Sequence, residues 1–154
     1  FSDTTLTAES GPLTITAAAL TGEFPNWRRV FPETTSRLEL DPKKLGAALR
    51  RAGVMSLANA NRVRIKSDAA GVLLTAFGQD WGSYSETLAL PTGGDAVEFA
   101  MNYRYLSDAL KALGGVWDGL TVAWKSNGAP FIFSPVVLRG EVEARVVIMP
   151  MAMN

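Results

Sequence analysis

Short stretches of alternating hydrophobic and polar residues recur along the chain, and this alternation predicts β-strands. The first two stretches, residues 4–9 and 12–20, flank Ser10-Gly11 and therefore predict a β-hairpin. Because two strands alone are marginally stable in water, such a hairpin needs a larger sheet to join. We therefore interpret residues 1–23 as the last strands of a preceding domain.

A proline-rich and aromatic stretch, residues 24–32, follows the hairpin. It reads Phe24-Pro25-Asn26-Trp27-Arg28-Arg29-Val30-Phe31-Pro32. Each proline restricts the residue before it to an extended backbone, so neither a long helix nor a central strand is expected here. We predict an interdomain linker over residues 24–35. Its aromatic and aliphatic side chains favour a position against an apolar surface.

Residues 36–154 predict a single α+β domain. Its strands are expected at residues 37–40, 62–67, 72–77, 85–90, 97–101, 120–125, 130–133 and 142–149. A first helix begins at Asp41-Pro42, an N-cap residue followed by a proline in the first turn, and ends near Leu57. A second helix begins after Asn102 and ends at Gly114-Gly115.

The domain contains an internal repeat. Residues 38–53 and 99–114 match without a gap in their apolar positions, their Asp or Asn cap and their cations, at a displacement of 61 positions, from 38 to 99. Each copy contains a strand, a cap and an amphipathic helix, and three strands follow each helix. We therefore expect two β-α-β-β-β halves with pseudo-two-fold symmetry, whose helices pack side by side on one side of the sheets.

Basic residues recur at matching positions of the two predicted helices. Lys43 and Arg50 lie seven residues apart in the first helix, which places them on one face, away from the leucines. Arg104 and Lys111 repeat this spacing in the second helix. The basic residues of the two helices are Lys43, Lys44, Arg50, Arg51, Arg104 and Lys111. For one helix alone, a basic face that is exposed to solvent is a sufficient explanation. The same spacing of cations in both helices favours a positive stripe that contacts phosphates.

The composition excludes several kinds of site. The 154 residues include neither cysteine nor histidine, which removes disulfides, thiolate chemistry, Ser-His-Asp triads and the common zinc sites. Four carboxylates that could serve in catalysis form no recognisable motif: Asp80, Asp95, Asp108 and Asp118. With 15 basic and 15 acidic residues the net charge is zero, so any contact with nucleic acid depends on local clusters. We expect no catalytic residue, no metal and no cofactor.

The chain ends on an apolar tail, residues 146–153, that is rich in methionine. Exposed apolar surface usually marks a recognition site, and flexible methionines suit a site that accepts several ligands. The alternative is that residues 147–149 form only the last strand of the core. No stretch approaches the ~18 apolar residues of a membrane span, and the first residues lack the pattern of a signal peptide. We therefore expect a cytoplasmic protein without membrane contact.

Four separated stretches resemble the bacterial DNA polymerase III β subunit, the β sliding clamp family. They are residues 23–32, which look like that family's FPDYRRVLP linker, and residues 60–65, 101–106 and 147–151. The resemblance implies the DNA clamp fold, with residues 36–154 as the C-terminal domain and residues 1–23 as the end of the middle domain. Full clamps have three similar domains, and the chain corresponds to about the last two fifths of that length.

The resemblance also implies a function. Sliding clamps are processivity factors of DNA replication without a catalytic site of their own. They close as homodimer rings around duplex DNA without reading its sequence, on the nucleoid in the cytoplasm. They tether the replicative polymerase catalytic subunit, the clamp loader and other clamp-motif proteins through a hydrophobic peptide-binding pocket. Carboxylates such as Glu86 are then expected on the outside of the ring, away from the cations that line the hole.

Residue roles follow from the matching motifs. The resemblance places the peptide pocket at Pro25, Arg29, Val30, Asn102, Tyr105, Val147, Ile148, Met149, Pro150 and Met151. It makes the six helix cations DNA-facing, and it matches Val54 and Met55 to the subunit interface, for which the last turn of a core-facing helix is the alternative. The other pocket wall belongs to the middle domain, and Ala60 stands where relatives can carry a Phe.

A different class of protein, a stand-alone β-rich carbohydrate-binding or adhesion module, is the alternative function. It rests on the tryptophans, Trp27, Trp81, Trp117 and Trp124, which are more often packing residues than a sugar platform. Such a module does not explain the repeated helix with its paired cations. An enzyme that uses carboxylates is a third, weaker hypothesis.

Overall fold

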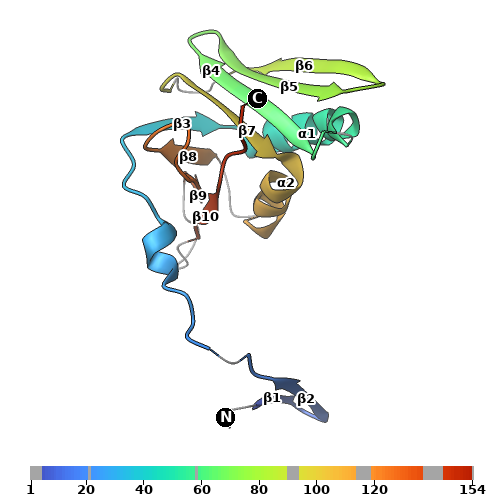
Figure 1. The fold of residues 1–154 in the computed structure, drawn as a ribbon. Coiled ribbons are helices and arrows are strands. Elements are labelled where there is room, and N and C mark those ends of the chain that lie inside the picture. The colour runs from blue at the N-terminus through green and yellow to red at the C-terminus, as the bar shows by residue number, and fades with distance from the viewer. Residues whose placement is uncertain are drawn as a thin grey trace.

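The computed structural model describes residues 5–20, 22–57, 59–89, 94–113, 119–136 and 144–153. The chain begins with the predicted hairpin, in which β1 (Thr5–Ser10) pairs antiparallel with β2 (Leu13–Ala18). Figure 1 shows this hairpin well separated from the remaining strands and helices. A linker with one 3-10 turn, η1 (Trp27–Val30), connects it to the rest of the chain.

Within the described chain, the linker does not lie against an apolar surface. Phe24 is 81% exposed, and Trp27 and Val30 are about half exposed. The side chains of this segment contact one another instead: the Trp27 and Phe31 rings meet edge to face at 5.8 Å, and the Arg28 guanidinium lies 4.4 Å from the centre of the Trp27 ring. The short turn between Pro25 and Pro32 agrees with the expected lack of a long helix or a central strand.

The described residues after the linker form an α+β domain with the predicted order of elements (Figure 1). The first half contains β3 (Ser36–Leu40), α1 (Pro42–Ser56), β4 (Arg62–Asp68), β5 (Gly71–Gly78) and β6 (Gly82–Leu88). The second half contains β7 (Val97–Asn102), α2 (Tyr103–Ala112), β8 (Leu120–Trp124), β9 (Phe131–Pro135) and β10 (Val146–Ile148). The repeated β-α-β-β-β unit is therefore confirmed.

The two halves exchange their first strands, which the repeat did not predict. One antiparallel sheet has the order β6-β5-β4-β7 and the other has the order β10-β9-β8-β3. β3 of the first half pairs with β8 of the second, and β7 of the second half pairs with β4 of the first. Each sheet is thus completed by a strand from the other half of the repeat.

The bounds of β6 and β10 differ most from the prediction. β6 begins three residues earlier than expected, at Gly82, and ends at Leu88. β10 spans only Val146–Ile148, whereas a strand was expected over residues 142–149, of which 142 and 143 lie outside the described residues. The predicted turn at 91–94 and the predicted helix end at Gly114-Gly115 also fall largely or wholly outside them. β10 is consequently a very short edge strand.

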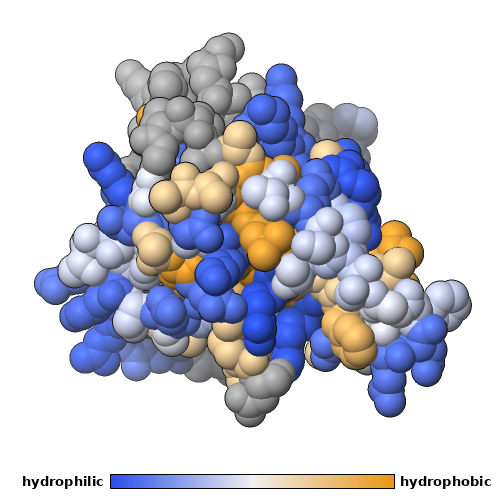
Figure 2. Space-filling view, turned by 90° about the horizontal axis from the view of Figure 1, so that it is seen from above, coloured by the Kyte–Doolittle hydropathy of each residue, from blue (hydrophilic) through white to orange (hydrophobic). Residues whose placement is uncertain are grey.

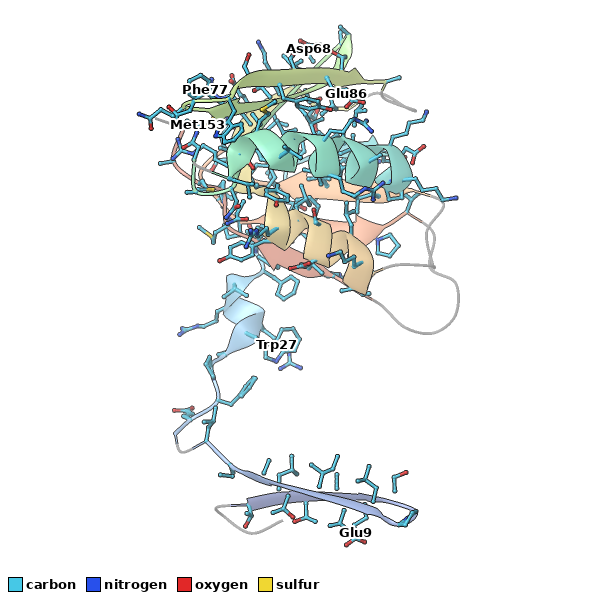
Figure 3. The ribbon with its side chains drawn as sticks, turned by 90° about the vertical axis from the view of Figure 1, so that its right-hand side faces the viewer. Glu9, Trp27, Asp68, Phe77, Glu86 and Met153 are labelled. Carbon is cyan, nitrogen blue, oxygen red and sulfur yellow. The ribbon has the colours of Figure 1, made fainter. Side chains whose placement is uncertain are left out.

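Local capping explains where both helices begin. The Asp41 carboxylate accepts hydrogen bonds from the backbone N–H groups of Lys43 and Lys44, at 2.9 and 3.1 Å. Asn102 does the same for α2 through the N–H of Arg104, at 3.0 Å. Both predicted caps are confirmed, and α1 and α2 pack side by side (Figures 1 and 3).

A glycine allows the close contact between the helices. A Cβ atom at Gly53 on α1 would lie 2.6 Å from a ring carbon of Tyr103, the first residue of α2. Any larger residue at position 53 would therefore displace the Tyr103 ring.

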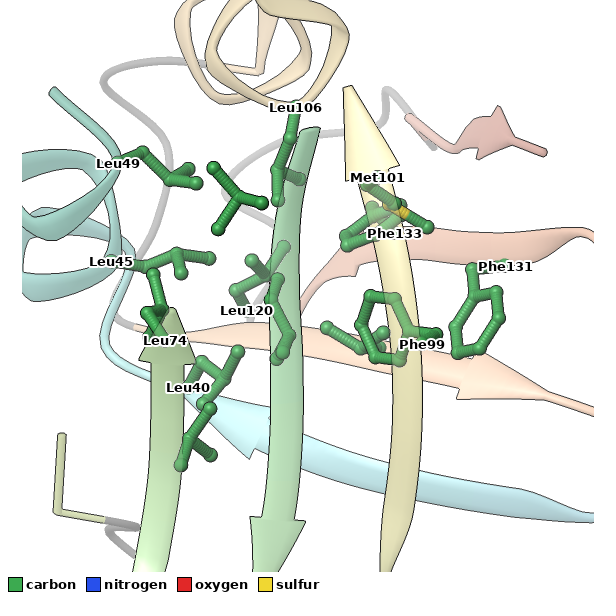
Figure 4. Packing of buried hydrophobic residues seen from close by; sticks show 14 of the residues in the cluster. Leu40, Leu45, Leu49, Leu74, Phe99, Met101, Leu106, Leu120, Phe131 and Phe133 are labelled. Carbon is green, nitrogen blue, oxygen red and sulfur yellow. The ribbon is translucent and has the colours of Figure 1, made fainter. Parts of the chain in front are cut away.

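The hydrophobic core lies between the helices and the inner faces of the sheets. Leu45 and Leu49 of α1 and Leu106 of α2 are fully buried there (Figure 4). The Phe131 ring of β9 lies 4.2 Å from that of Phe99 and 5.7 Å from that of Trp124, centre to centre. Each such side chain contributes about 1.5–3 kcal/mol when it is fully buried. Both halves therefore contribute to one shared core.

The outside of the domain is more polar. Seen from above, on the side of β4, β5 and β6, hydrophilic side chains surround several small hydrophobic areas (Figure 2). In the described part of the chain, no helix is both long and apolar enough to cross a membrane.

Candidate partner-binding groove and basic helix face

A groove of about 430 Å³ lies between α2 and the last strand, β10. Its lining residues are Tyr105, Asp108, Ala109, Ala112, Val146, Val147, Ile148 and Met149. The α2 members are spaced by three, four and seven residues, which places them on one face of the helix. One wall is thus a helix face and the other is an edge strand, and most of the lining is apolar.

Four of the predicted pocket residues meet in this groove: Tyr105, Val147, Ile148 and Met149. Tyr105 and Met149 are 63% and 60% exposed, so both can contact a ligand. Ile148 is 6% exposed and belongs to the hydrophobic core. Ile148 therefore belongs to both the core and the groove lining, whereas Val147 and Met149 line the groove without belonging to the core.

The motifs did not single out four other lining residues, Asp108, Ala109, Ala112 and Val146. The three helical ones follow Tyr105 at positions i+3, i+4 and i+7, so the helical period alone could have identified them. Val146 lies two residues before Ile148, and it also packs against the core. Alanines carry no chemical signal of their own, which is why motif matching passed over them.

The remaining predicted pocket residues of the domain lie beside the groove rather than in its lining. Asn102 caps α2, and its side-chain amide lies 3.5 Å from the Ala60 carbonyl oxygen. Its position fixes the start of the helix that carries Tyr105. Pro150 and Met151 continue past β10, and the N–H of Met151 donates to the carbonyl of Ala100 at 2.7 Å.

The predicted pocket residues of the linker, Pro25, Arg29 and Val30, are exposed and absent from the groove lining. A separate hollow, also of about 430 Å³, lies beside the linker instead. It is lined by Trp27, Arg28, Phe31 and Arg145. The structure therefore brings four of the domain's predicted pocket residues together in the groove and leaves the linker's residues apart from it.

All six predicted DNA-facing cations are exposed. They differ in their partners: Lys111 Nζ lies 3.0 Å from a carboxylate oxygen of Asp108, and Lys44 Nζ lies 3.9 Å from one of Asp41. Such exposed pairs contribute little to stability, typically about 0–1 kcal/mol. They do reduce the positive charge that these two lysines offer to an external phosphate.

Of the six helix cations, Arg51 has the shortest ion-pair distance in the described structure, and its partner is Glu86. The expectation that Glu86 lies away from these cations is therefore wrong. Arg51 Nη2 lies 2.7 and 2.8 Å from the Glu86 carboxylate oxygens, and Arg51 Nε lies 3.0 Å from one of them. Tyr84 donates to the same carboxylate from the same strand, β6. Glu86 is thus held against a cation instead of lying apart from the basic helices.

These contacts shift the proton affinities of the group. Hydrogen bonds from Arg51 and Tyr84 lower the pKa of Glu86 below its ordinary value of 4.5. Partial burial, together with the adjacent carboxylate, raises the pKa of Tyr84 above its ordinary value of 10.0. Arg51, Tyr84 and Glu86 therefore tie the flank of α1 to the edge strand β6 at neutral pH.

The predicted interface residues Val54 and Met55 lie near the end of α1, with different exposure. Val54 is 66% exposed, whereas Met55 is half-buried and packs against the core. A Cβ at Gly78 would lie 2.7 Å from the Met55 carbonyl oxygen, so the turn between β5 and β6 comes close to this end of the helix. The same turn contains Trp81, which is 74% exposed.

Some of the residues behind the alternative functions have structural roles in the described part of the chain. Trp124 is buried in the core at 3% exposure, and Trp117 lies outside the described residues. Of the carboxylates, Asp95 accepts a hydrogen bond from the backbone N–H of Arg37 at 2.9 Å, and Asp108 pairs with Lys111. The described residues contain no group of three or more acidic side chains that could hold a metal ion.

The fold of this chain matches that of solved bacterial sliding clamps. The crystal structure of the DNA polymerase III β chain of Streptococcus pneumoniae superposes with a TM-score of 0.87 at 21% identity, over 99% of this chain and 40% of that one. The sliding clamp of Bartonella birtlesii, solved bound to griselimycin, gives the same TM-score at 23% identity. The fold class predicted from the sequence is confirmed.

Sequence comparison identifies the family. The family model for the C-terminal domain of the DNA polymerase III β subunit matches residues 28–152. The β sliding clamp of Synechococcus elongatus is 31% identical over 143 residues, which cover 91% of this chain and 37% of that protein. The chain therefore belongs to the DNA polymerase III β subunit family, as the sequence motifs predicted, and it spans less than half the length of these relatives.

Proposed function

We propose that this chain acts as the C-terminal part of a sliding clamp, a processivity factor that encircles duplex DNA and tethers the replicative polymerase. Family membership and the clamp fold support this role. The observation that carries it is the apolar groove between α2 and β10, because four of the predicted pocket residues meet there. In this role the chain needs no catalytic site of its own, and it acts on the nucleoid.

The groove is suited to the hydrophobic anchors of a short linear peptide. Tyr105 and Met149 offer exposed apolar surface on opposite walls, and the flexible methionine can repack around different anchors. A structurally similar protein, the sliding clamp of Bartonella birtlesii, was solved with griselimycin bound. We propose that the polymerase, the clamp loader and other clamp-motif proteins use this groove.

The linker and the hairpin complete the proposed assembly. Leu6, Leu13 and Ile15 of the hairpin are each about half exposed, so the hairpin has apolar surface to add to a larger sheet. We propose that residues 1–23 belong to the preceding domain and that this domain supplies the second pocket wall. Its contact with the linker would then bring Pro25, Arg29 and Val30 to the site.

The basic face of α1 and α2 is proposed to meet the DNA. Lysine and arginine neutralise phosphates without reading bases, which allows movement along any sequence. Lys43, Arg50 and Arg104 are exposed and make no ion pair in the described part of the chain, so they offer the full charge. Val54 and Met55 are proposed to meet the next subunit of a homodimer ring.

The test of the groove is the binding of a fluorescein-labelled peptide that carries a polymerase clamp-binding motif, followed by anisotropy. We expect Tyr105→Arg and Met151→Arg to weaken binding at least about ten-fold, because each introduces a charge among apolar groups, and ten-fold corresponds to about 1.4 kcal/mol. Trp81→Arg is the control, since it makes the same kind of change at an exposed site outside the groove lining. Binding unaffected by Tyr105→Arg, or no binding by the folded wild type, would overturn the proposal.

A further inference from the structure

The apolar tail is attached to the neighbouring sheet after it leaves β10. Its first attachment is the hydrogen bond from the N–H of Met151 to the carbonyl of Ala100 on β7, at 2.7 Å. Its second is the hydrogen bond that the Met153 carbonyl accepts from Nη2 of Arg64 on β4, at 2.9 Å. The end of the chain accordingly lies beside β7 in Figure 1, and Figure 3 shows Met153 next to the sheet that contains Phe77.

Arg64 is well placed to hold this segment. In the register of β4 and β7 it lies directly opposite Ala100, the residue that forms the first attachment. Its Nη1 also lies 3.6 Å from a carboxylate oxygen of Glu98, on β7. The guanidinium fork can serve Glu98 and the Met153 carbonyl together, which a lysine ammonium does less well.

We propose that Arg64 is a positioning residue for the groove: it fixes the tail so that Met149 and Met151 stay in place for a partner peptide. This inference rests on the proposed function of the groove. Chain ends without attachments are usually poorly ordered. If the tail is in place for only a fraction of the time, the apparent affinity for the peptide is reduced in proportion to that fraction. Because Arg64 holds the tail before the peptide binds, less conformational entropy is lost on binding.

The test compares Arg64→Met with Lys66→Met. Lys66 lies two residues further along β4, so both side chains extend from the same face of the strand, and both substitutions remove one exposed positive charge. The Lys66 side chain makes no ion pair or hydrogen bond with another residue that the structure describes, which makes it a matched control. Two quantities are measured: amide hydrogen exchange at Met151 by NMR, and the Kd of the labelled clamp-motif peptide.

We expect Arg64→Met to speed exchange at Met151 and to weaken peptide binding about three- to ten-fold, the effect of losing one partly exposed, charge-assisted hydrogen bond. Arg64→Lys should give an intermediate loss, and Lys66→Met should change neither quantity. In a chain that ends at Pro150, Arg64→Met should have no further effect on binding, because the tail it holds is gone.

Three results would overturn the role of Arg64: wild-type exchange and affinity in Arg64→Met, equal losses in Arg64→Met and Lys66→Met, or an undiminished loss in the shortened chain. Exchange at the β4 amides serves as a check that the sheet is intact. If the wild type binds no peptide, the proposed function fails. The exchange rate of Met151 then still decides whether Arg64 holds the tail.

Discussion

The two halves of the domain use the same unit in different ways. In the first half, α1 packs against β4, β5 and β6, and Arg51 binds Glu86 of the edge strand. In the second half, α2 packs against α1, against β7 and against the three-residue edge strand β10. At the repeat displacement of 61 positions, the residue that corresponds to Arg51 is Ala112, which lines the groove.

This difference shows how two copies of one unit can differ in a groove: the second copy leaves open a flank that the first closes. The core positions are kept, since Leu45 and its counterpart Leu106 are both fully buried. What changes is the flank of the helix. A long edge strand and an arginine–glutamate pair close that flank on α1, whereas a short edge strand and an alanine leave it open on α2.

The largest effects are expected from the matched core leucines. Leu45→Ala should destabilise the domain by about 4 kcal/mol, because α1 is held on three strands and the cavity cannot collapse. Leu106→Ala should cost about 2–3 kcal/mol, since the groove beside α2 lets the surroundings relax. Urea denaturation measures both free energies of unfolding. An equal loss of unfolding free energy in the two variants would show that the open flank of α2 does not let the surroundings relax.

Closing the open flank should abolish the site. Ala112→Arg places at the groove the residue type that closes the first half, and we expect peptide affinity to fall about ten-fold or more, or about 1.4 kcal/mol. Arg51→Ala, the reverse change in the other half, should leave the Kd unchanged. Fluorescence anisotropy with the labelled peptide gives both values. A similar loss in both variants would show that the groove is not the binding site.

Breaking the closed flank should have a smaller effect that depends on pH. The folded pKa of Glu86 is lowered, so its stabilising contribution is present above the ordinary pKa of 4.5 and is lost as pH falls through the folded value. Glu86→Gln should therefore lower the Tm by about 2 °C at pH 7 and by less below pH 4 (about the effect of one exposed ion pair). Thermal scans across this range, with Glu33→Gln as control, measure it. A constant difference at all pH values would contradict the ion-pair explanation.

The smallest effect is expected for the matched cations of the two helices. Arg50 and Lys111 occupy equivalent positions, but only Lys111 has an acidic partner in the described structure, Asp108. Arg50→Gln should reduce the salt dependence of duplex DNA binding by about one unit of log–log slope, and Lys111→Gln by less. Titrations of labelled duplex at several salt concentrations give the slopes. Equal slopes for both variants would show that Asp108 does not screen Lys111.

Local features of the fold could be predicted from the sequence, because their causes lie within a few residues. Asp41 and Asn102 cap the N–H groups two or three positions later, and the hairpin turns at Gly11-Pro12, one residue after the predicted Ser10-Gly11. The exchange of β3 and β7 was not predicted, because strand partners are selected by packing over long sequence separations. The repeat indicated two similar units but not how they combine.

The candidate site shows the same division. Tyr105 and Met149 were predicted through motifs and do lie in the groove. Ala112 was missed because alanine has no functional group, and it contributes to the groove only through its small size. The pairing of Arg51 with Glu86 joins residues 35 positions apart, so charge patterns within one helix could not reveal it.

The exchanged strands make the two halves dependent on each other for folding. β3 completes the sheet of β8, β9 and β10, and β7 completes the sheet of β4, β5 and β6. A half expressed alone would therefore lack one strand of its sheet and keep one without a partner. The domain is expected to unfold in one cooperative step. If the chain were cut between β6 and β7, neither fragment would be stable alone, yet the two should reassemble when mixed.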